Sequence, residues 1–351
     1  MQLFGPLQRP IRATLAFLAA LLVASVTLTA CGGKSATSGS GGKVALKIAE
    51  PVHGVGYLPL YVGIQKGFFA EQGLDVSTVT LAGGGAHTNA VLTGAAWGFI
   101  GGPEHNAFAK AKGASIRGIV NIVNRGNIYL VAPKGVSYDG NLASFLKGKT
   151  IVTSSFGGTP NSITRYLLDK AGLKVGTDVK LIETGDPAAM LTIVQQGQAQ
   201  VAVTSEPILG RGVNQGIWGE PFYSAPKELG PYAYSTLNIK EDSIKSDPAS
   251  VEKFVKAMIK SLDYVDKHHD ESFDIAHKEF PTFDPEVLRA TLKRSYDDQL
   301  WEFSGRISTA ALDTALAVVR ASGVLKDKDK PVQYADIIDM TYVDKVISTS
   351  G

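Results

Sequence analysis

Small polar residues follow several predicted strands, where a chain can bind a ligand through side chains and backbone N–H groups. In the first part of the chain these positions are His53, Gly54, Tyr57, Gly84, Gly85, Gly102, Glu104 and His105. In the second part they are Ser154, Ser155, Gly157, Gly158, Thr159, Thr204, Ser205 and Glu206. A helix that starts in such a loop offers N–H donors to an anion or to a polar carbonyl. Each loop could equally be a tight turn, but their shared position at the same ends of the strands favours a binding site.

Two tyrosines and two glutamates indicate what such a site would take. Tyr57 and Tyr234 could cover an apolar or aromatic part of a ligand. Glu104 and Glu206 end matching strands and could form an acid/base pair, but they are better explained as ligand acceptors or as contacts between two halves of the fold. Two carboxylates would repel a bare oxyanion unless Arg125 or another cation lies between them. This favours a solute with hydrogen-bond donors, unless both glutamates point away from the site.

Motifs for catalysis and for metal binding are absent from the sequence. The 6 His residues show no H-E-x-x-H or similar ligand spacing. The glycines at 83–85 are not followed by Gly-Lys-Ser/Thr as in a P-loop, and Gly-x-Ser-x-Gly does not occur. We therefore expect no catalytic residue, no metal and no cofactor.

These positions lie in a pattern of short apolar strands that alternate with amphipathic helices, which is typical of an α/β protein with parallel sheets. The predicted strands span 45–49, 76–81, 97–101, 116–123, 127–132, 150–153, 179–183 and 199–204. The predicted helices between them span 59–72, 86–93, 104–112, 159–171 and 187–196. From Asp247, a good N-cap before Pro248, only helices follow, the later ones at 285–300, 308–321 and near 334–346.

A weak internal repeat organises the middle of the chain. Gly73-Leu74-Asp75-Val76 and Gly172-Leu173-Lys174-Val175 each lead through a loop and a helix to a strand that ends in a polar loop. Such similarity also arises by chance. Taken as real, it predicts two lobes with the same connectivity, whose strand ends face a shared crevice of the kind in which open parallel sheets bind ligands.

The first 30 residues have the features of a secretory signal peptide. Arg9 and Arg12 precede an apolar stretch that ends in Leu28-Thr29-Ala30-Cys31, which is too short and wrongly flanked for a membrane span. The ending resembles a bacterial lipobox, in which Cys31 becomes the lipidated N-terminus. Residues 31–43 are rich in Gly and Ser and would form a flexible tether. The alternative is an ordinary signal peptide in which Cys31 has no role.

The composition sets further limits. The chain has 351 residues, a formal net charge of +2 and 44% hydrophobic residues, which excludes a disordered or coiled-coil protein and allows two or three domains. Without an excess of Lys and Arg there is no electrostatic case for binding nucleic acid. The single Cys excludes an intramolecular disulfide framework and a multi-cysteine metal site.

The segment at 56–79 resembles the opening of a known family. It reads Gly56-Tyr57-Leu58-Pro59-Leu60-Tyr61-Val62-Gly63, then Lys66-Gly67-Phe68-Phe69, then Gln72-Gly73-Leu74-Asp75-Val76. This pattern is similar to that of the periplasmic binding proteins for nitrate, sulfonates, taurine and thiamine precursors, the extracytoplasmic subunits of ABC importers. Weaker matches at 142–152 and 199–207 extend the resemblance over essentially the whole chain from Val44.

The resemblance implies a two-lobed, type II-like periplasmic-binding-protein fold with a ligand cleft between the lobes. We expect lobe one at 44–131 plus 229–351 and lobe two at 132–228, with crossings near 131–134 and 223–234. The implied function is non-catalytic capture of a small organic solute, either sulfonate-, taurine- or nitrate-like or similar to a pyrimidine vitamin precursor, for an ABC permease and its ATPase.

The same resemblance places the protein in the periplasm or at the cell surface. We expect a monomer, attached to the membrane by the lipid on Cys31 and without a nucleic-acid partner. One alternative is a pyrimidine-precursor-synthesising enzyme of the same superfamily, although a cytoplasmic enzyme would not need an export signal. The other is a solute sensor, which would need a membrane span and a transmitter domain.

Overall fold

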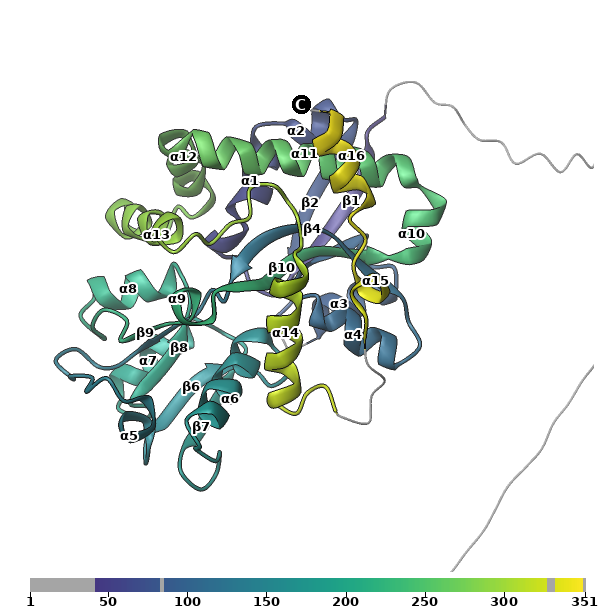
Figure 1. Ribbon diagram of the computed structural model, residues 1–351. Coiled ribbons are helices and arrows are strands. Elements are labelled where there is room, and N and C mark those ends of the chain that lie inside the picture. The colour runs from purple at the N-terminus through teal and green to yellow at the C-terminus, as the bar shows by residue number, and fades with distance from the viewer. Residues whose placement is uncertain (1–41, 83–84, 327–331, 350–351) are drawn as a thin grey trace, which may run out of the picture. The chain divides into compact units, whose positions relative to one another are not determined.

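The computed structural model describes residues 42–82, 85–326 and 332–349, so the predicted signal peptide, Cys31 and Gly84 lie outside the described residues. The described residues form two five-stranded sheets with helices packed around them (Figure 1). The two sheets, each with its own helices, give the mixed α/β, two-lobed architecture that the sequence predicts.

The first sheet has the strand order β2-β1-β3-β10-β4, and the second has the order β7-β6-β8-β5-β9. The strands of the first sheet are β1 (Val44–Glu50), β2 (Leu74–Thr80), β3 (Gly98–Gly101), β4 (Ile116–Arg125) and β10 (Pro231–Lys240). Those of the second are β5 (Tyr129–Val131), β6 (Thr150–Ser154), β7 (Lys180–Thr184), β8 (Val201–Thr204) and β9 (Tyr223–Ser224). In each sheet three parallel strands adjoin one antiparallel strand, which is β10 in the first sheet and β5 in the second. The predicted repeat therefore corresponds to two sheets of matching connectivity.

Helices connect the parallel strands and cover both sheets (Figure 1). In the first lobe they are η1 (Val55–Tyr57), α1 (Leu58–Gln65), α2 (Phe68–Glu71), α3 (Ala86–Leu92) and α4 (Glu104–Ala111). In the second lobe they are α5 (Leu142–Leu146), α6 (Thr159–Lys170), α7 (Ala189–Gln195), α8 (Ile208–Asn214) and α9 (Ala225–Leu229). The helix predicted at 59–72 is interrupted at Gly67, whose φ of 77° only glycine adopts readily.

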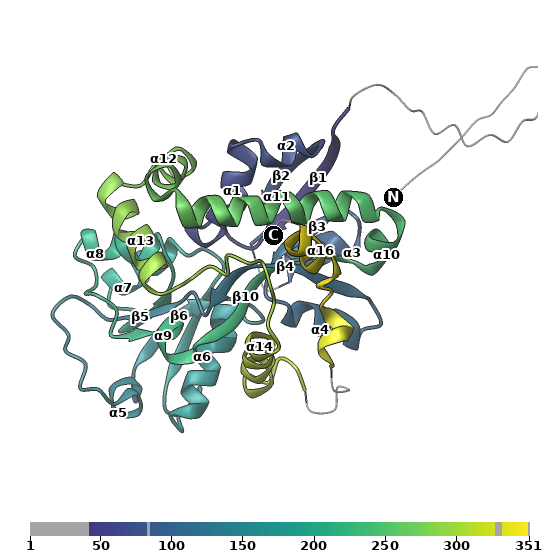
Figure 2. The same ribbon diagram turned by 45° about the horizontal axis from the view of Figure 1, so that its top comes forward.

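The C-terminal tail is helical, as the sequence predicts. It consists of α10 (Glu241–Ser246), α11 (Pro248–Lys267), α12 (His269–Glu279), α13 (Pro285–Asp297), α14 (Thr309–Ala321), α15 (Tyr334–Ile337) and α16 (Thr341–Thr349). The side chain of Asp247 caps α11 by accepting from the Ser250 N–H, and the apolar stripe of this helix, including Phe254 and Met258, is fully buried. In Figure 2, α11 lies across the first lobe beside α16, and the two helices are in contact.

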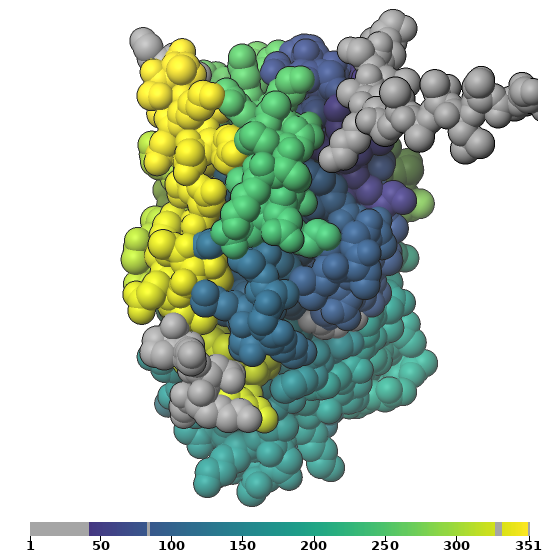
Figure 3. Space-filling model, turned by 90° about the vertical axis from the view of Figure 1, so that its right-hand side faces the viewer, coloured from purple at the N-terminus to yellow at the C-terminus, as the bar shows by residue number. Residues whose placement is uncertain are grey.

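One tail helix reaches the second lobe. α14 packs both on β10 of the first sheet and on α6 of the second lobe. In Figure 3 the yellow C-terminal residues extend along this side of the molecule down to the teal residues of the second lobe. The tail therefore contacts both lobes.

The strand β10 is absent from the predicted strands. Its polar residues Ser235, Thr236 and Asn238 are all buried, because they bond to backbone and side-chain groups inside the first lobe. The Nδ2 of Asn238, for example, lies 3.0 Å from the carbonyl oxygen of Gly101. These polar residues interrupt the apolar pattern by which the other strands were predicted.

The chain passes from β4, which ends at Arg125, to β5, which begins at Tyr129, and it returns from α9 to β10 at Gly230 and Pro231. Within the described residues, β5 pairs with β8 and β9 of the second sheet, although the predicted boundary assigns residues 129–131 to lobe one. The exact lobe boundaries and the two crossings stay predictions.

Candidate functional site

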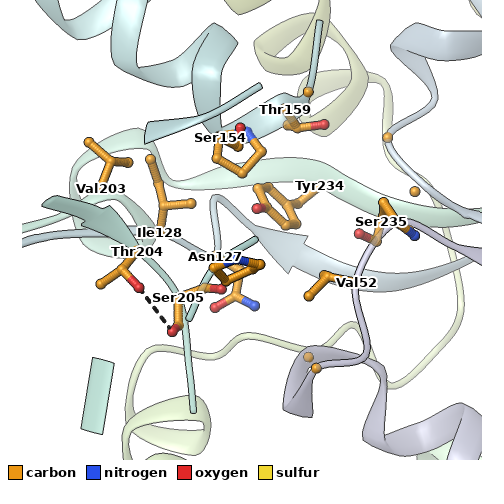
Figure 4. Close-up of a pocket in the computed structure, with 18 of the residues that line it drawn as sticks. Val52, Asn127, Ile128, Ser154, Thr159, Val203, Thr204, Ser205, Tyr234 and Ser235 are labelled. Carbon is orange, nitrogen blue, oxygen red and sulfur yellow. Dashed lines mark hydrogen bonds between the residues drawn. The ribbon is translucent and has the colours of Figure 1, made fainter. Parts of the chain in front are cut away.

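A cavity of about 130 Å³ lies where the carboxyl ends of parallel strands from both sheets meet. Its lining residues from the first lobe are Pro51, Val52, Gly54, Gly56, Tyr57, His87, Gly101, Gly102, His105, Tyr234 and Ser235. The others are Asn127, Ile128, Ser154, Ser155, Gly158, Thr159, Pro160, Thr184, Gly185, Pro187, Met190, Val203, Thr204, Ser205 and Glu206. Figure 4 shows Tyr234 and Asn127 in the middle of this group, with Thr204 and Ser205 on one side and Ser235 and Val52 on the other.

The start of α6 forms one wall of the cavity. Its N-terminal N–H groups are partly committed already, because Asn161 N–H donates to Ser154 Oγ at 3.1 Å and Gly158 N–H donates to the Ser155 carbonyl oxygen at 3.1 Å. Pro160, in the first turn, has no N–H at all. This helix start therefore offers fewer backbone donors to an anion than its Gly- and Ser-rich sequence predicts.

The charges around the cavity are few. Among the described lining residues there is no Lys or Arg, and the only carboxylate is that of Glu206. Its Oε2 accepts from Gly210 N–H and from Thr291 Oγ1, both at 2.9 Å, and its Oε1 accepts from Arg294 Nε at 3.0 Å. Burial raises the pKa of Glu206, while these three donors act in the opposite direction. The carboxylate thus joins the second lobe to α13 and is already occupied on both oxygens.

Glu104 lies directly behind the cavity wall. Its side chain is 1% exposed and folds back over Gly102, where a Cβ would lie 2.0 Å from the glutamate Oε2. Its Oε1 accepts from Thr159 Oγ1 across the two lobes at 2.6 Å, whereas its Oε2 has no hydrogen-bond partner among the described residues. Burial raises the pKa of Glu104 to about 7, although the bond from Thr159 opposes this effect.

Neutral donors and acceptors supply the rest of the polar surface. Tyr57 is buried, and its hydroxyl accepts from Ser235 Oγ at 3.4 Å, so that its own proton can point to another acceptor. Burial raises the pKa of Tyr57 and of Tyr234, so both hydroxyls stay protonated donors at neutral pH. The amide of Asn127, on the chain between the two sheets, adds two donors and an acceptor.

Two histidines close the cavity at the end of β3. The rings of His87 and His105 pack edge to face, with centroids 4.6 Å apart, and both side chains are buried. Burial lowers the pKa of His105 to about 4 and also lowers that of His87, so both rings are neutral at pH 7. They add polarity to the site without adding charge.

The structure brings most of the predicted site residues together. Those that line the cavity are Gly54, Tyr57, Gly102, His105, Ser154, Ser155, Gly158, Thr159, Thr204, Ser205, Glu206 and Tyr234. Those that do not line it are His53, Gly85, Glu104, Arg125 and Gly157. The contact of each residue with a solute stays a prediction.

Two of the residues outside the cavity are bound elsewhere. His53 Nδ1 lies 2.9 Å from Oε1 of the buried Glu50, and its ring packs against Tyr61. Arg125 donates to the side chain of Gln299 at 2.9 Å and is not positioned as a cation between Glu104 and Glu206.

Several lining residues are not among the site residues predicted from the sequence. Thr184 directly follows the strand predicted at 179–183, which is the same signal that identified other site residues, whereas Asn127 begins the strand predicted at 127–132 and carries no such signal. Ser235 lies on β10, next to Tyr234 and within a strand that the apolar pattern did not reveal. Val52 and Met190 add apolar surface and carry no sequence signal that separates them from core residues.

No helix within the described ranges combines the length and apolar character needed to span a bilayer.

The chain is 27% identical over 307 residues to YtlA of Bacillus subtilis (strain 168). YtlA is described as a putative binding protein, and its name specifies no ligand. The match covers 86% of this chain and 90% of YtlA.

Solved structures with the same fold include a protein from Bordetella bronchiseptica RB50, at 23% identity and a TM-score of 0.74, covering 88% of this chain and 98% of that one. They also include the alkanesulfonate-binding protein SsuA of Xanthomonas axonopodis pv. citri bound to MOPS, at 15% identity and a TM-score of 0.69, covering 86% and 99%. The sequence pattern of the family described as NMT1/THI5 like matches residues 55–272. The resemblance seen in the sequence is thereby confirmed, and the chain belongs to the NMT1/THI5-like family.

Proposed function

We propose that this protein is an extracytoplasmic solute-binding protein that captures a small organic solute and delivers it to the permease of an ABC importer. The observation that carries the proposal is the cavity between the strand ends of two lobes, lined by hydroxyl, amide and aromatic groups. Two lobes that enclose a solute exclude water from it, and the enclosed form differs in shape from the open one, which a permease can recognise.

Binding without catalysis is supported by the state of the titratable groups. His87 and His105 are neutral and, among the described residues, neither makes a side-chain hydrogen bond to a hydroxyl or a carboxylate that would activate a nucleophile. The carboxylate of Glu206 is engaged by Arg294 and two further donors. A carboxylate held in this way is a contact between structural elements, not a free general base.

Two solute classes remain under this proposal. A small sulfonate, taurine or nitrate is suggested by SsuA, an alkanesulfonate-binding protein of the same fold. A pyrimidine-type vitamin precursor is suggested by the neutral lining, because an anion would have no Lys or Arg among the described lining residues. Tyr57 and Tyr234 could pack against a flat ring, and the neutral donors could bind its nitrogen atoms. We favour the second class.

Mass spectrometry of the natively purified protein, followed by calorimetric titration with each compound found, tests the proposal. We expect one small molecule per chain and saturable binding that raises the melting temperature by several degrees at 100 times its dissociation constant, about 2.7 kcal/mol of stabilisation. Turnover of the bound compound by the purified protein would refute a purely binding role. Absence of any saturable small-molecule ligand would refute the proposal as a whole.

We also propose that Cys31 carries a lipid anchor, since it follows an apolar stretch and precedes a Gly- and Ser-rich tether. Two or more acyl chains anchor a protein stably, whereas one chain binds only marginally. We expect the wild-type protein in the membrane fraction and Cys31→Ser without attached lipid. Unmodified Cys31 in a wholly soluble wild-type protein would refute this proposal.

The two chain crossings would act as the hinge between lobe one and lobe two. Closure by rotation about short connecting segments is a common response of two-lobed binders to their solute. Small-angle scattering with and without the identified solute measures it. A radius of gyration that stays the same at saturation would argue for a rigid cavity.

A further inference from the structure

The wall of the cavity at Thr159 is backed by a buried carboxyl group that no cation neutralises within the part of the chain that the structure describes. Thr159 is 8% exposed and lines the cavity, and its hydroxyl lies 2.6 Å from Glu104 Oε1. Glu104 is 1% exposed, and its Oε2 has no partner in residues 42–82, 85–326 and 332–349. Unlike Glu206, which is paired with Arg294, Glu104 therefore has one short hydrogen bond and no counter-charge from these residues.

The groups that face Glu104 from the surrounding elements are uncharged. Tyr57 comes from η1, Tyr232 and Tyr234 come from β10, and Thr159 comes from α6. Burial, and to a smaller extent the nearby charge of Glu104, raises the pKa of the three tyrosines, so none of them ionises near neutral pH. Next along α4, His105 is kept neutral by burial. Glu104 is thus the only group of this cluster that changes charge near pH 7.

The direction of the hydrogen bond decides what Thr159 offers to the cavity. An ionised carboxylate only accepts, so the single hydroxyl proton of Thr159 must point to Glu104. Toward the cavity, Thr159 Oγ1 then presents lone pairs and no proton. If Glu104 is protonated, its own O–H can donate to Thr159 Oγ1, and the threonine proton becomes free to point into the cavity.

We infer that Glu104, acting through Thr159, selects the solute: while Glu104 is ionised, this wall binds an N–H or O–H donor of the solute and disfavours a bare oxyanion at the same place. Glu104 is a positioning residue in this role, since Thr159 lies between it and the cavity. Tyr57 and Tyr234 can donate from other parts of the lining. The solute class is then a molecule with a donor toward Thr159 and acceptors elsewhere. This inference rests on the proposed solute-binding function.

The affinity for a solute should change with pH in a direction that the titration of Glu104 determines. The pKa of Glu104 is about 7 in the folded protein. A solute donor bound to Thr159 favours ionised Glu104, so binding releases protons and affinity for donor-bearing solutes rises with pH through this range. A solute that needs a donor at Thr159 shows the opposite trend.

Matched pairs of small probes test the inference by calorimetric titration. One pair is 2-aminopyrimidine against 2-methylpyrimidine, and the other is 2-hydroxyethane-1-sulfonate against propane-1-sulfonate. In each pair an N–H or O–H donor group replaces a methyl group, and both members of a pair carry the same charge between about pH 6 and about pH 8. We expect the preference for the donor-bearing member, as a ratio of dissociation constants, to increase about 3- to 10-fold from pH 6 to pH 8, the value of one hydrogen bond.

Three variants separate Glu104 from other causes. In Glu104→Gln the preference should no longer change with pH. Thr159→Val should abolish the preference at both pH values, and Thr159→Ser, which keeps the hydroxyl, should restore it. Circular dichroism melts establish that each variant is folded. His53, whose pKa is raised mainly by its hydrogen bond to Glu50, is unchanged in Glu104→Gln. A pH effect that persists in this variant therefore belongs to His53 or to another group, and it overturns the inference.

Two further results of the titrations distinguish a failure of this inference from a failure of the proposed function. If a probe pair binds with the same preference at both pH values in the wild-type protein, the inference is wrong while the proposed function stands. If none of the four probes binds at millimolar concentration, the solute classes of the proposed function are wrong, and the inference falls with them.

Discussion

Replacing Glu104 by Gln should make the protein more stable at alkaline pH and leave it less changed at acidic pH. The pKa of Glu104 is about 7 in the folded protein, against an ordinary value of 4.5, because the carboxyl group is buried and no cation among the described residues offsets that effect. Below about pH 4.5 both the folded and the unfolded chain hold this proton, so it contributes no pH dependence there. As the pH rises toward 7, the unfolded chain loses the proton first, and the free energy of unfolding falls.

The size of this loss of stability follows from the difference between the pKa of Glu104 in the folded and the unfolded chain. Each unit of difference between folded and unfolded pKa corresponds to about 1.4 kcal/mol, so the difference between 4.5 and about 7 gives a penalty of about 3 kcal/mol above pH 7. Gln has nearly the same shape and does not titrate. Its amide leaves one polar group without a partner where Glu104 Oε2 lies, but this cost is independent of pH.

The assay is urea denaturation of the wild-type and Glu104→Gln proteins at several pH values between about 4 and about 8. The stability difference between the two proteins, rather than either stability alone, isolates Glu104 from all other titrating groups. We expect that difference to shift by about 3 kcal/mol in favour of Gln across the range. Glu71→Gln is the control, since its side chain is 51% exposed and should shift by less than about 1 kcal/mol. A difference that stays constant with pH would refute the argument that Glu104 lacks charge compensation.

Three further predictions concern the packing around the site. Arg294→Met should lower the free energy of unfolding by about 2–4 kcal/mol, because it leaves the carboxylate of Glu206 buried without its cation while Arg294 itself is 24% exposed. Gly212→Ala should cost about 3 kcal/mol, because a Cβ there would lie 2.0 Å from the Trp218 ring. The hydrogen bond to Glu50 is the main reason that the pKa of His53 is raised. Protonated His53 therefore contributes its full share to the free energy of unfolding below pH 6.5, and this contribution is lost as the pH rises through the raised pKa. Comparing wild type with His53→Gln in denaturant titrations should therefore show an advantage of less than about 1 kcal/mol that disappears at high pH.

Matched substitutions control for these changes. Lys293→Met lies on the same helix as Arg294 but is 75% exposed, so it should change stability by less than about 0.5 kcal/mol. Gly219→Ala places its Cβ where no atom lies within 4 Å and should be nearly neutral. If Lys293→Met cost as much as Arg294→Met, the buried pair would not be the cause. A His53→Gln protein whose deficit grew with pH would contradict the sign derived for His53.

The sequence predicts the fold well because the signals for it are local. The N-cap Asp247 before Pro248 depends on residues within one helical turn, and it occurs where it is predicted. The strand β10 escapes prediction because the environment that stabilises it is not local. Asn238 is buried on this strand only because the carbonyl oxygen of Gly101, 137 residues away in sequence, accepts its hydrogen bond.

The same distinction applies to the site. Turn and helix-start signals are sufficient to place Ser154 and Thr159 at the end of a strand, and the parallel connectivity then brings them to one edge of the sheet. The roles of the two glutamates are different, because each depends on a partner distant in sequence. Glu104 is bonded to a threonine 55 residues away, whereas Glu206 is bonded to an arginine 88 residues away. Both carboxylates follow equivalent strands, β3 and β8, but within the described residues only Glu206 has a cation. The asymmetry that leaves Glu104 able to take up a proton near neutral pH therefore arises from the packing of α6 and α13, and not from the motif in which each glutamate occurs.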